Sequence, residues 1–509
     1  EYGYVYVDKT AYIFRMIDEG MFYFLARPRR FGKSLLVSTL KCLFQGRREL
    51  FHGLWIDKQA EWQWKPHPVI TIDFNQIPHH TPESLKKGIS LDLEKTAEEW
   101  GIVLKTPFIE TQFQELISGL NRQTNARVVI LVDEYDKPLI DYLGKGEEFL
   151  NVAKANRDIL KRFFGVLKGA TISPLLRFVF LTGISKFSRV SIFSELNNLD
   201  DLTMNRVYSE MLGYTEAELE RDLAGHVKRF AEETAVSPEE IRQQLKRRYD
   251  GYRFSEKETT VYNPYSVLKA LHHMEFKDYW FETATPTFLV NLLRERNYPV
   301  PEIENMRVDE QVFSTYDLNN LKPEAILFQT GYVTIKGFQG SLFRLDYPNL
   351  EVRNSFLKHL VFAFTKSVNG GESSRFLLLS DFLRKEAFEA FFDTIRAIFA
   401  SIPYSLESKR DEAYFHTLFY LMISASGTEA RSEVLTCRGR IDLLVSFPDK
   451  IFLMEFKCNQ SADAGIRQIR EKGYAESHLE SGRPVFLMGI NLSTEARNVT
   501  EWKIERMEA

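Results

Sequence analysis

Cysteine is scarce in this chain, which has three among its 509 residues. Cys42, Cys437 and Cys458 include no C-x-x-C pair, and three is the wrong number for a disulfide framework. The pattern excludes a disulfide-stapled scaffold and argues against a structural zinc site. We therefore expect a reducing compartment, the cytoplasm.

Long apolar runs and a strong excess of one charge are also missing. The longest runs, such as residues 128–132, fall far short of the ~18 residues that a membrane span needs. No signal peptide is visible, although the chain begins at Glu1 and native residues are expected upstream. Lys+Arg 66 nearly balance Asp+Glu 70, giving a formal net charge of −4. Contact with nucleic acid would therefore depend on local basic patches rather than on a global positive field.

The remaining composition is that of an ordinary globular protein, with 44% hydrophobic and 27% charged residues. At roughly 150 residues per domain, the length predicts about three domains. Changes in pattern along the chain place them at residues 1–205, 206–375 and 376–509.

The first domain alternates short apolar segments with amphipathic stretches. The nearly continuous apolar segments are residues 21–26, 69–74, 128–132 and 178–182. Strands that are buried on both faces of a parallel sheet have this composition. The predicted fold is an α/β, doubly wound parallel sheet with helices on both faces.

The middle of the chain is more charged and is predicted to be helical. Residues 215–218 and 237–240 fit capping boxes that open helices. The basic residues that follow, within 242–248, are most simply a solvated helix face. Residues 329–348 predict a β-hairpin, either the wing of a winged-helix-like module or a simple structural hairpin. Residues 380–400 predict one amphipathic helix that packs on a core.

A phosphate-binding loop is predicted where the first strand meets a helix, at residues 27–34 (RPRRFGKS). Loop N–H groups and the helix dipole would meet the phosphates there. Lys33 would reach the β- and γ-phosphates, and the Ser34 hydroxyl would ligate Mg²⁺. Arg27 replaces the usual first glycine, and G-K-S alone is a weak signal, so the strand-to-helix context carries the prediction. The predicted ATP-binding residues of this loop are Arg29, Arg30, Phe31, Gly32, Lys33 and Ser34.

The apolar strand at residues 128–132 ends in two adjacent acids. Asp133 would bind the nucleotide's Mg²⁺, and Glu134 would act in catalysis by polarising the attacking water. The alternative is a buried strand that merely ends in a polar turn. The strand at residues 178–182 ends in TGISK, where polar groups could sense the γ-phosphate or Ser185 could cap a helix.

Several motifs together make the chain similar to the bacterial and archaeal AAA-ATPase-like proteins with a C-terminal PD-(D/E)XK nuclease domain. The motifs are residues 6–10, 27–34, 133–138, 181–188, 196–200 and 262–264. The resemblance covers nearly the whole chain, and the family shares the missing first glycine. It implies a P-loop ATPase followed by an α/β restriction-endonuclease-like domain. By analogy, residues 6–10 would line the base pocket, although a core strand edge explains Tyr6 as well.

A second site is predicted in the last domain, where two apolar strands flank the turn at residues 447–450. Antiparallel pairing would bring Asp442 close to Glu455 and Lys457, which share one side of their strand. Two carboxylates suit a hard cation, Mg²⁺ or Mn²⁺, that would activate water, and Lys457 would add positive charge. This is the D…E-x-K arrangement that the resemblance implies, with Glu433 as a candidate further acid. A decayed nuclease fold and a structural salt bridge are the alternatives.

Other basic and polar residues are candidates for roles at the two sites. In the family, Gln468 and Tyr474 lie on the helix that covers the nuclease site. Residues 467, 470 and 472 are basic and would contact a phosphate backbone or be solvated. The candidates for a charge-stabilising arginine, supplied in cis or by a neighbouring subunit, are Arg177, Arg189 and Arg206.

These patterns predict an enzyme in which ATP binding or hydrolysis controls metal-dependent phosphodiester cleavage. The rival hypothesis is a nucleotide-dependent switch or binding regulator whose nuclease fold is inactive. The intact set of Asp442, Glu455 and Lys457 favours the enzyme. The expected cofactors are ATP and Mg²⁺, with Mn²⁺ as an option at the nuclease site. The expected partner is nucleic acid, with DNA favoured over RNA but the choice left open, and no membrane is expected. The oligomeric state, a homo-oligomer included, is also left open.

Overall fold

The computed structural model divides into two compact units, Glu1–Glu282 with Arg307–Leu350 (unit 1) and Thr283–Met306 with Glu351–Ala509 (unit 2). The described residues are 5–186, 198–281, 287–296, 298–314, 318, 321–365, 372–402, 412–426, 428–436 and 439–508. The three domain ranges given above stay a prediction.

Unit 1 is built on a five-stranded parallel sheet of order β2-β3-β4-β1-β5. Its strands are β1 (Phe22–Ala26), β2 (Val69–Asp73), β3 (Val128–Asp133), β4 (Leu176–Gly183) and β5 (Asp200–Asp201). Every residue of β1 and β3 is buried, as the continuous apolar runs require for strands covered on both faces. The predicted parallel sheet is confirmed.

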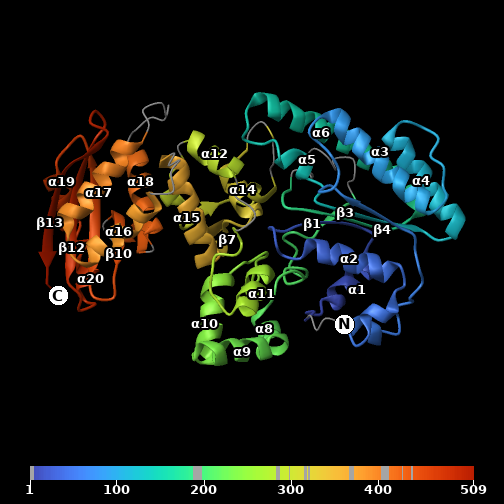
Figure 1. Ribbon diagram of the computed structural model, residues 1–509, viewed down its shortest axis with the longest axis horizontal. Helices are drawn as coiled ribbons and strands as arrows, with labels where there is room; N and C mark the ends of the chain where they lie inside the picture. The colour runs from blue at the N-terminus through green and yellow to red at the C-terminus, as the bar shows by residue number, and fades with distance from the viewer. Residues whose placement is uncertain are drawn as a thin grey trace. The chain divides into compact units, whose positions relative to one another are not determined.

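Helices cover both faces of this sheet (Figure 1). α1 (Thr10–Glu19) and α2 (Lys33–Phe44) lie on one face, and α3 (Pro82–Glu99), α4 (Ile109–Thr124) and α6 (Glu147–Gly165) lie on the other. Short helices complete this part: α5 (Lys137–Ile140), η1 (Arg48–Phe51), η2 (Trp55–Lys58), η3 (Val166–Lys168) and η4 (Ser173–Leu175). The doubly wound architecture predicted from the alternating pattern is therefore present.

The predicted helical middle region is confirmed. It contains α8 (Glu216–Asp222), α9 (Ala224–Thr234), α10 (Pro238–Tyr249) and α11 (Pro264–His273). Thr215 and Glu218 form a reciprocal capping box on α8, and the Ser237 hydroxyl accepts from the α10 backbone. The basic run on α10 is partly paired within this region, because Lys246 binds Glu216 at 3.1 Å.

The predicted hairpin is also present in unit 1. β7 (Thr334–Gln339) pairs antiparallel with β8 (Leu342–Asp346) across a two-residue turn in which Gly340 has φ 61°. The neighbouring elements are β6 (Met306–Val308), α13 (Gln311–Ser314) and α14 (Pro323–Gln329).

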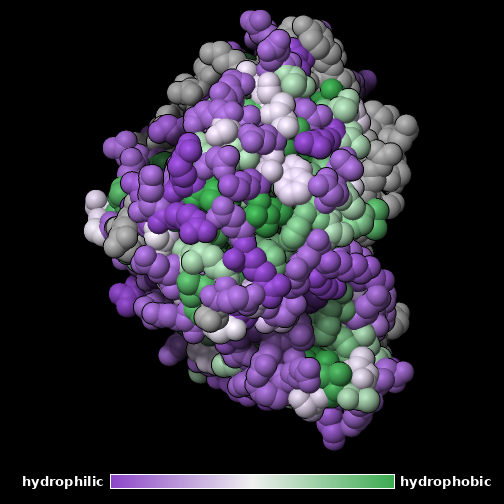
Figure 2. Space-filling view, turned by 90° about the vertical axis from the view of Figure 1, so that its left-hand side faces the viewer, coloured by the Kyte–Doolittle hydropathy of each residue, from purple (hydrophilic) through white to green (hydrophobic). Residues whose placement is uncertain are grey.

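Unit 2 contains a five-stranded sheet of order β13-β12-β11-β10-β9, in which only the β11–β12 pair is parallel. Its strands are β9 (Glu429–Thr436), β10 (Gly439–Ser446), β11 (Ile451–Cys458), β12 (Val485–Ser493) and β13 (Asn498–Met507). Its helices are α12 (Thr287–Glu295), η5 (Val300–Ile303), α15 (Leu350–Thr365), α16 (Glu372–Arg384), α17 (Phe388–Ser401), α18 (Glu412–Ala425), α19 (Ala462–Glu471) and α20 (Glu476–Leu479). The face of the molecule in Figure 2 is mostly hydrophilic, with hydrophobic side chains in small patches.

Successive side chains of β11 point to opposite faces of this sheet, and a helix covers each face. Phe456 packs against Phe419 of α18, with 4.9 Å between ring centroids, whereas Glu455 points to Gln468 of α19. α19 can approach the sheet closely because Gly489 has no side chain. A Cβ at this position would lie 2.0 Å from the Ala462 carbonyl oxygen. The α/β C-terminal domain is as predicted.

The single helix expected over residues 380–400 is wrong, because α16 ends at Arg384 and α17 begins at Phe388. Glu386 between them is left-handed, with φ 58°. Lys450, distant in sequence, donates to the Arg384 carbonyl at 3.0 Å and pairs with Glu386 at 2.6 Å. This ammonium satisfies a terminal carbonyl of α16, so a tertiary contact ends a helix that the local pattern would continue.

Among the described residues, no helix has both the length and the apolar character needed to cross a bilayer.

Candidate functional sites

The first candidate site is the loop between β1 and α2. Gly32 caps α2 with φ 89°, and Arg30 is also left-handed, with φ 68°. A Cβ on Gly32 would meet open space, so the backbone conformation rather than crowding favours glycine there. The turn opens α2 directly after β1, and the free N–H groups of a helix start suit a bound anion.

Lys33 is buried at the start of α2, with 4% of its surface exposed. Its ammonium donates to the carbonyl oxygens of Arg27 (3.1 Å) and Pro28 (3.3 Å) and lies 3.5 Å from the Glu134 carboxylate. The ammonium therefore lies between the loop backbone and the end of β3, and its contact with the nucleotide phosphates stays a prediction.

The two acids at the end of β3 lie beside this lysine. Burial raises the pKa of Asp133, and a hydrogen bond donated by the Ser34 hydroxyl opposes that rise. Glu134 is left-handed, with φ 51°, and its N–H donates to Asp133 at 3.0 Å. The structure thus brings together Lys33, Ser34, Asp133 and Glu134, four of the predicted residues.

Asp136 is a residue of this site for which the sequence predicted no role. It is fully buried, and one carboxylate oxygen accepts from Ile184 N (3.0 Å), Ser185 N (2.7 Å) and Ser185 Oγ (2.6 Å). Burial raises the pKa of Asp136 to about 6. The Thr182 hydroxyl donates to the Leu25 carbonyl oxygen at 2.7 Å. The hydroxyls of Thr182 and Ser185 at the end of β4 therefore both form hydrogen bonds within the protein. The sequence signal that could have identified Asp136 is the repetition of acids in the segment DEYD, residues 133–136.

Two of the other predicted loop residues, Phe31 and Arg30, direct their side chains toward the middle region of unit 1. Phe31 is buried against Tyr252, with ring centroids 4.8 Å apart. The Arg30 guanidinium lies 3.8 Å from the ring centroid of Tyr265, and Arg29 is exposed. Binding of ATP by these three residues stays a prediction, which their backbone N–H groups could still serve.

A small apolar cavity lies next to the start of α2. Its lining comes from the N-terminal segment, α2 and residues 211–214, and includes Tyr6, Val7, Lys9, Leu35, Leu36 and Tyr214. The Lys9 ammonium binds Glu218 of α8 at 2.6 Å. The segment predicted to line a base pocket therefore borders a cavity beside the loop.

The candidate arginines are placed differently. Arg177 is the second residue of β4, near the end of the strand opposite to Thr182, so it does not reach the loop of its own chain. Arg206 lines a separate polar pocket with Lys186 and Asp201. Arg189 lies outside the described residues.

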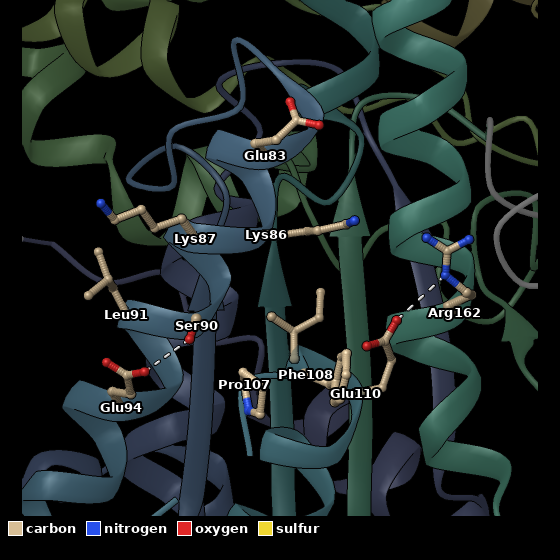
Figure 3. Close-up of a pocket in the computed structure, with 11 residues that line it drawn as sticks. Glu83, Lys86, Lys87, Ser90, Leu91, Glu94, Pro107, Phe108, Glu110 and Arg162 are labelled. Atoms are coloured by element: carbon tan, nitrogen blue, oxygen red, sulfur yellow. Dashed lines mark hydrogen bonds and ion pairs between the residues drawn. The ribbon is translucent and has the colours of Figure 1, made fainter. Parts of the chain in front are cut away.

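A larger pocket of about 710 Å³ lies between α3, α4 and α6 (Figure 3). Its lining carries both signs of charge, including Lys86 beside an ion pair between Arg162 and Glu110 at 3.6 Å. None of the predicted site residues lines it, and it belongs to neither candidate site.

The second candidate site is formed by the β10–β11 hairpin. Leu443 pairs with Met454, and this register sets Asp442 opposite Glu455. The N–H of Phe456 donates to the Asp442 carboxylate at 2.8 Å. Counting residues across the predicted hairpin therefore gave the correct juxtaposition.

Glu455 is buried, with 1% of its surface exposed. One carboxylate oxygen accepts from Lys457 at 3.2 Å and from the Gln468 amide. Within the described part of the chain, its other oxygen is buried and has no hydrogen-bond partner. Burial and the charge of Asp442 raise the pKa of Glu455 to about 7, while Lys457 opposes the rise. A buried carboxylate that has one oxygen without a partner and a raised pKa is suited to bind a cation.

The donor set fits a divalent ion that also uses water or substrate oxygens. Asp442 and Glu455 supply carboxylate oxygens, the ligands that Mg²⁺ and Mn²⁺ prefer. The described residues contain no group of three or more His, Cys, Asp or Glu side chains placed to hold a metal. Glu433 belongs to β9, but its side chain lies outside the described residues.

Two residues that the sequence analysis missed hold the backbone of Asp442. His416 of α18 lies 2.8 Å from the Asp442 carbonyl oxygen, and the Ser432 hydroxyl donates to the same oxygen at 3.1 Å. Because a carbonyl only accepts, His416 must carry its proton on Nε2. No motif spacing marked either residue.

Of the two residues predicted on the covering helix, Gln468 lies on α19, whereas Tyr474 follows the end of α19 at Glu471. Gln468 of α19 contacts Glu455, and the Tyr474 hydroxyl, just beyond α19, accepts from Arg440 N at 3.1 Å. Of the predicted phosphate-contacting cations, Arg470 is bound to Glu505 at 2.6 Å. Arg470 therefore fits the alternative in which these basic residues are solvated and do not contact a phosphate backbone.

The strand–loop–helix arrangement of β1 and α2, with acids at the end of β3 in the same sheet, is that of a P-loop ATPase-like domain, and the D…E-x-K hairpin is that of a nuclease-superfamily domain. The chain belongs to the family of AAA-ATPase-like proteins with a C-terminal PD-(D/E)XK nuclease-superfamily domain. The family models that match are "Predicted AAA-ATPase" over residues 1–193 and "PD-(D/E)XK nuclease superfamily" over residues 410–502.

A protein of Azotobacter chroococcum mcd 1, described as an uncharacterized protein in the vnfD 5' region, is 36% identical over 519 residues. The match covers 99% of this chain and 96% of that protein. No solved structure matches the chain.

Proposed function

We propose that unit 1 binds and hydrolyses ATP with Mg²⁺ and that this controls metal-dependent cleavage of nucleic acid by unit 2. The observation that carries the proposal is Glu455, a buried acid opposite Asp442 with an unsatisfied oxygen. A merely structural ion pair would not leave that oxygen without a partner.

In the nucleotide site, Lys33 would bind the phosphates and Ser34 with Asp133 would hold Mg²⁺. Glu134 would polarise the attacking water, as its place at the end of β3 beside Lys33 allows. The cavity bordered by Tyr6 and Leu35 would take the base.

In the nuclease site, Asp442 and Glu455 would hold Mg²⁺ or Mn²⁺, which supplies an activated water and stabilises charge on the phosphate. Lys457 would place a positive charge next to the scissile group. The nuclease-superfamily match supports nucleic acid as the substrate, and we propose DNA before RNA in a cytoplasmic setting. A homo-oligomer would let a second subunit supply an arginine to the ATP site.

The test uses the purified full chain with Mg²⁺ or Mn²⁺, with and without ATP, against single- and double-stranded DNA and RNA. We expect metal-dependent cleavage of DNA whose rate changes by about tenfold or more with ATP, equivalent to ~1.4 kcal/mol of coupling. A protein that binds ATP and cleaves none of the four substrates would instead be the switch described by the rival hypothesis.

The raised pKa of Glu455 predicts a pH dependence. Since Glu455 is protonated below about pH 7, a metal must displace that proton to bind. At limiting Mg²⁺, we expect the cleavage rate to rise about tenfold per pH unit up to about pH 7 and then level off. Higher Mg²⁺ should move the midpoint to lower pH. Initial cleavage rates from about pH 5.5 to about pH 8.5 at two metal concentrations check this prediction. The same midpoint of the pH–rate curve at both metal concentrations would contradict it.

A further inference from the structure

The first residue of the phosphate loop, Arg27, is buried although it carries a charge. Only 1% of its surface is exposed. Its guanidinium donates to the carbonyl oxygens of Ala26 (3.0 Å), Thr203 (2.7 Å) and Tyr208 (3.2 Å) and lies 4.2 Å from the ring centroid of Phe254. A P-loop usually has glycine here, so this chain has replaced a flexible position with an anchored one.

The rest of the loop packs against the same part of unit 1. The residues that surround it, named the collar here, are Thr203, Tyr208, Tyr252, Phe254, Tyr265, Trp280 and Gly331. Trp280 donates to the Arg29 carbonyl at 3.3 Å. A Cβ on Gly331, whose φ is 86°, would lie 2.6 Å from the Pro28 side chain. The loop and the collar are therefore in close contact along five consecutive residues, 27–31.

The same loop backbone holds the catalytic-site lysine. The Lys33 ammonium donates to the carbonyl oxygens of Arg27 and Pro28, the two residues that the collar fixes. The side chain of Arg27 thus binds the collar, and its backbone carbonyl orients the Lys33 ammonium. Rigid placement of a charge lowers the reorganisation needed when a ligand binds.

We propose that Arg27 is a positioning residue for the nucleotide site, which locks the loop to the collar and thereby sets the place of Lys33. Because coupling between two sites is reciprocal, ATP on the loop must in turn restrain the collar. This inference rests on the proposed ATP binding. It adds the element through which the middle region senses the nucleotide.

The test compares wild type with Arg27→Gly, which restores the usual P-loop residue, and with Arg27→Lys, which keeps a cation. ATP affinity is measured with a fluorescent ATP analogue, and hydrogen exchange is followed in residues 249–265. In the wild type, ATP should slow exchange in this segment. We expect Arg27→Gly to bind ATP at least tenfold more weakly and to lose the ATP-dependent protection, and Arg27→Lys to recover part of both.

The controls separate this inference from the proposed function and from misfolding. Circular dichroism and thermal unfolding report whether the variants are folded. If Arg27→Gly is unfolded, Trp280→Phe keeps an aromatic ring but removes the hydrogen bond to the loop, and it should still weaken the ATP-dependent protection. No ATP binding by the wild type would overturn the proposed function. Wild-type affinity and protection in folded Arg27→Gly, or unchanged protection in Trp280→Phe, would overturn this inference alone.

Discussion

Lys33→Ala is expected to weaken ATP binding by about a hundredfold, which corresponds to ~2.7 kcal/mol. The ammonium is buried beside Glu134 and is held in place by the carbonyl oxygens of Arg27 and Pro28. Its removal leaves the phosphates without a charge-assisted donor in a site that also contains Asp133 and Glu134. Titration with a fluorescent ATP analogue measures the loss directly.

A matched control for this variant is Lys41→Ala, which removes a lysine from the last turn of the same helix. We expect it to keep wild-type ATP affinity, because the loss depends on position in the loop rather than on the net charge of α2. Both variants should retain metal-dependent cleavage without ATP, since the D…E-x-K hairpin belongs to unit 2. Wild-type ATP affinity in Lys33→Ala would remove the loop from the nucleotide site.

The parts of both sites that were predictable from the sequence depend on short-range rules. Continuous apolar segments give buried parallel strands, and a glycine–lysine pair after one of them gives a helix start at a sheet edge. In the hairpin, alternation and antiparallel pairing suffice to set Asp442 opposite Glu455. These rules use neighbours in sequence or pairing across one turn, so no knowledge of tertiary packing was needed.

The parts that could not be predicted depend on contacts between distant segments. His416 belongs to α18, and only the packing of that helix on the sheet brings it to the Asp442 carbonyl. Lys450 ends α16 from 66 residues away. Arg27 belongs to a run that suggested phosphate binding, yet the collar determines where its side chain lies. In each case the side chain's partner is a backbone carbonyl, a group that every residue carries and that leaves no sequence signal.

Asp442→Asn is expected to lower metal-dependent cleavage by about a thousandfold while ATP binding stays unchanged. Asparagine keeps an oxygen that can accept from Phe456 N, so the hairpin contact is preserved. It removes the charge that helps to raise the pKa of Glu455 and that, with Glu455, would hold the metal. Single-turnover cleavage of labelled DNA at saturating Mg²⁺ measures the loss.

The melting temperature of Asp442→Asn separates a functional acid pair from a structural one. Two carboxylates in a buried site repel each other, so neutralising one should leave the melting temperature in the absence of metal unchanged or higher. If Asp442 instead completed a structural ion-pair network, the same change would lower stability. Asp449→Asn, at an exposed acid in the turn of the same hairpin, is the matched control and should cleave as the wild type does. Normal cleavage by Asp442→Asn, or a large drop in its melting temperature, would contradict the assignment of this hairpin as a metal site.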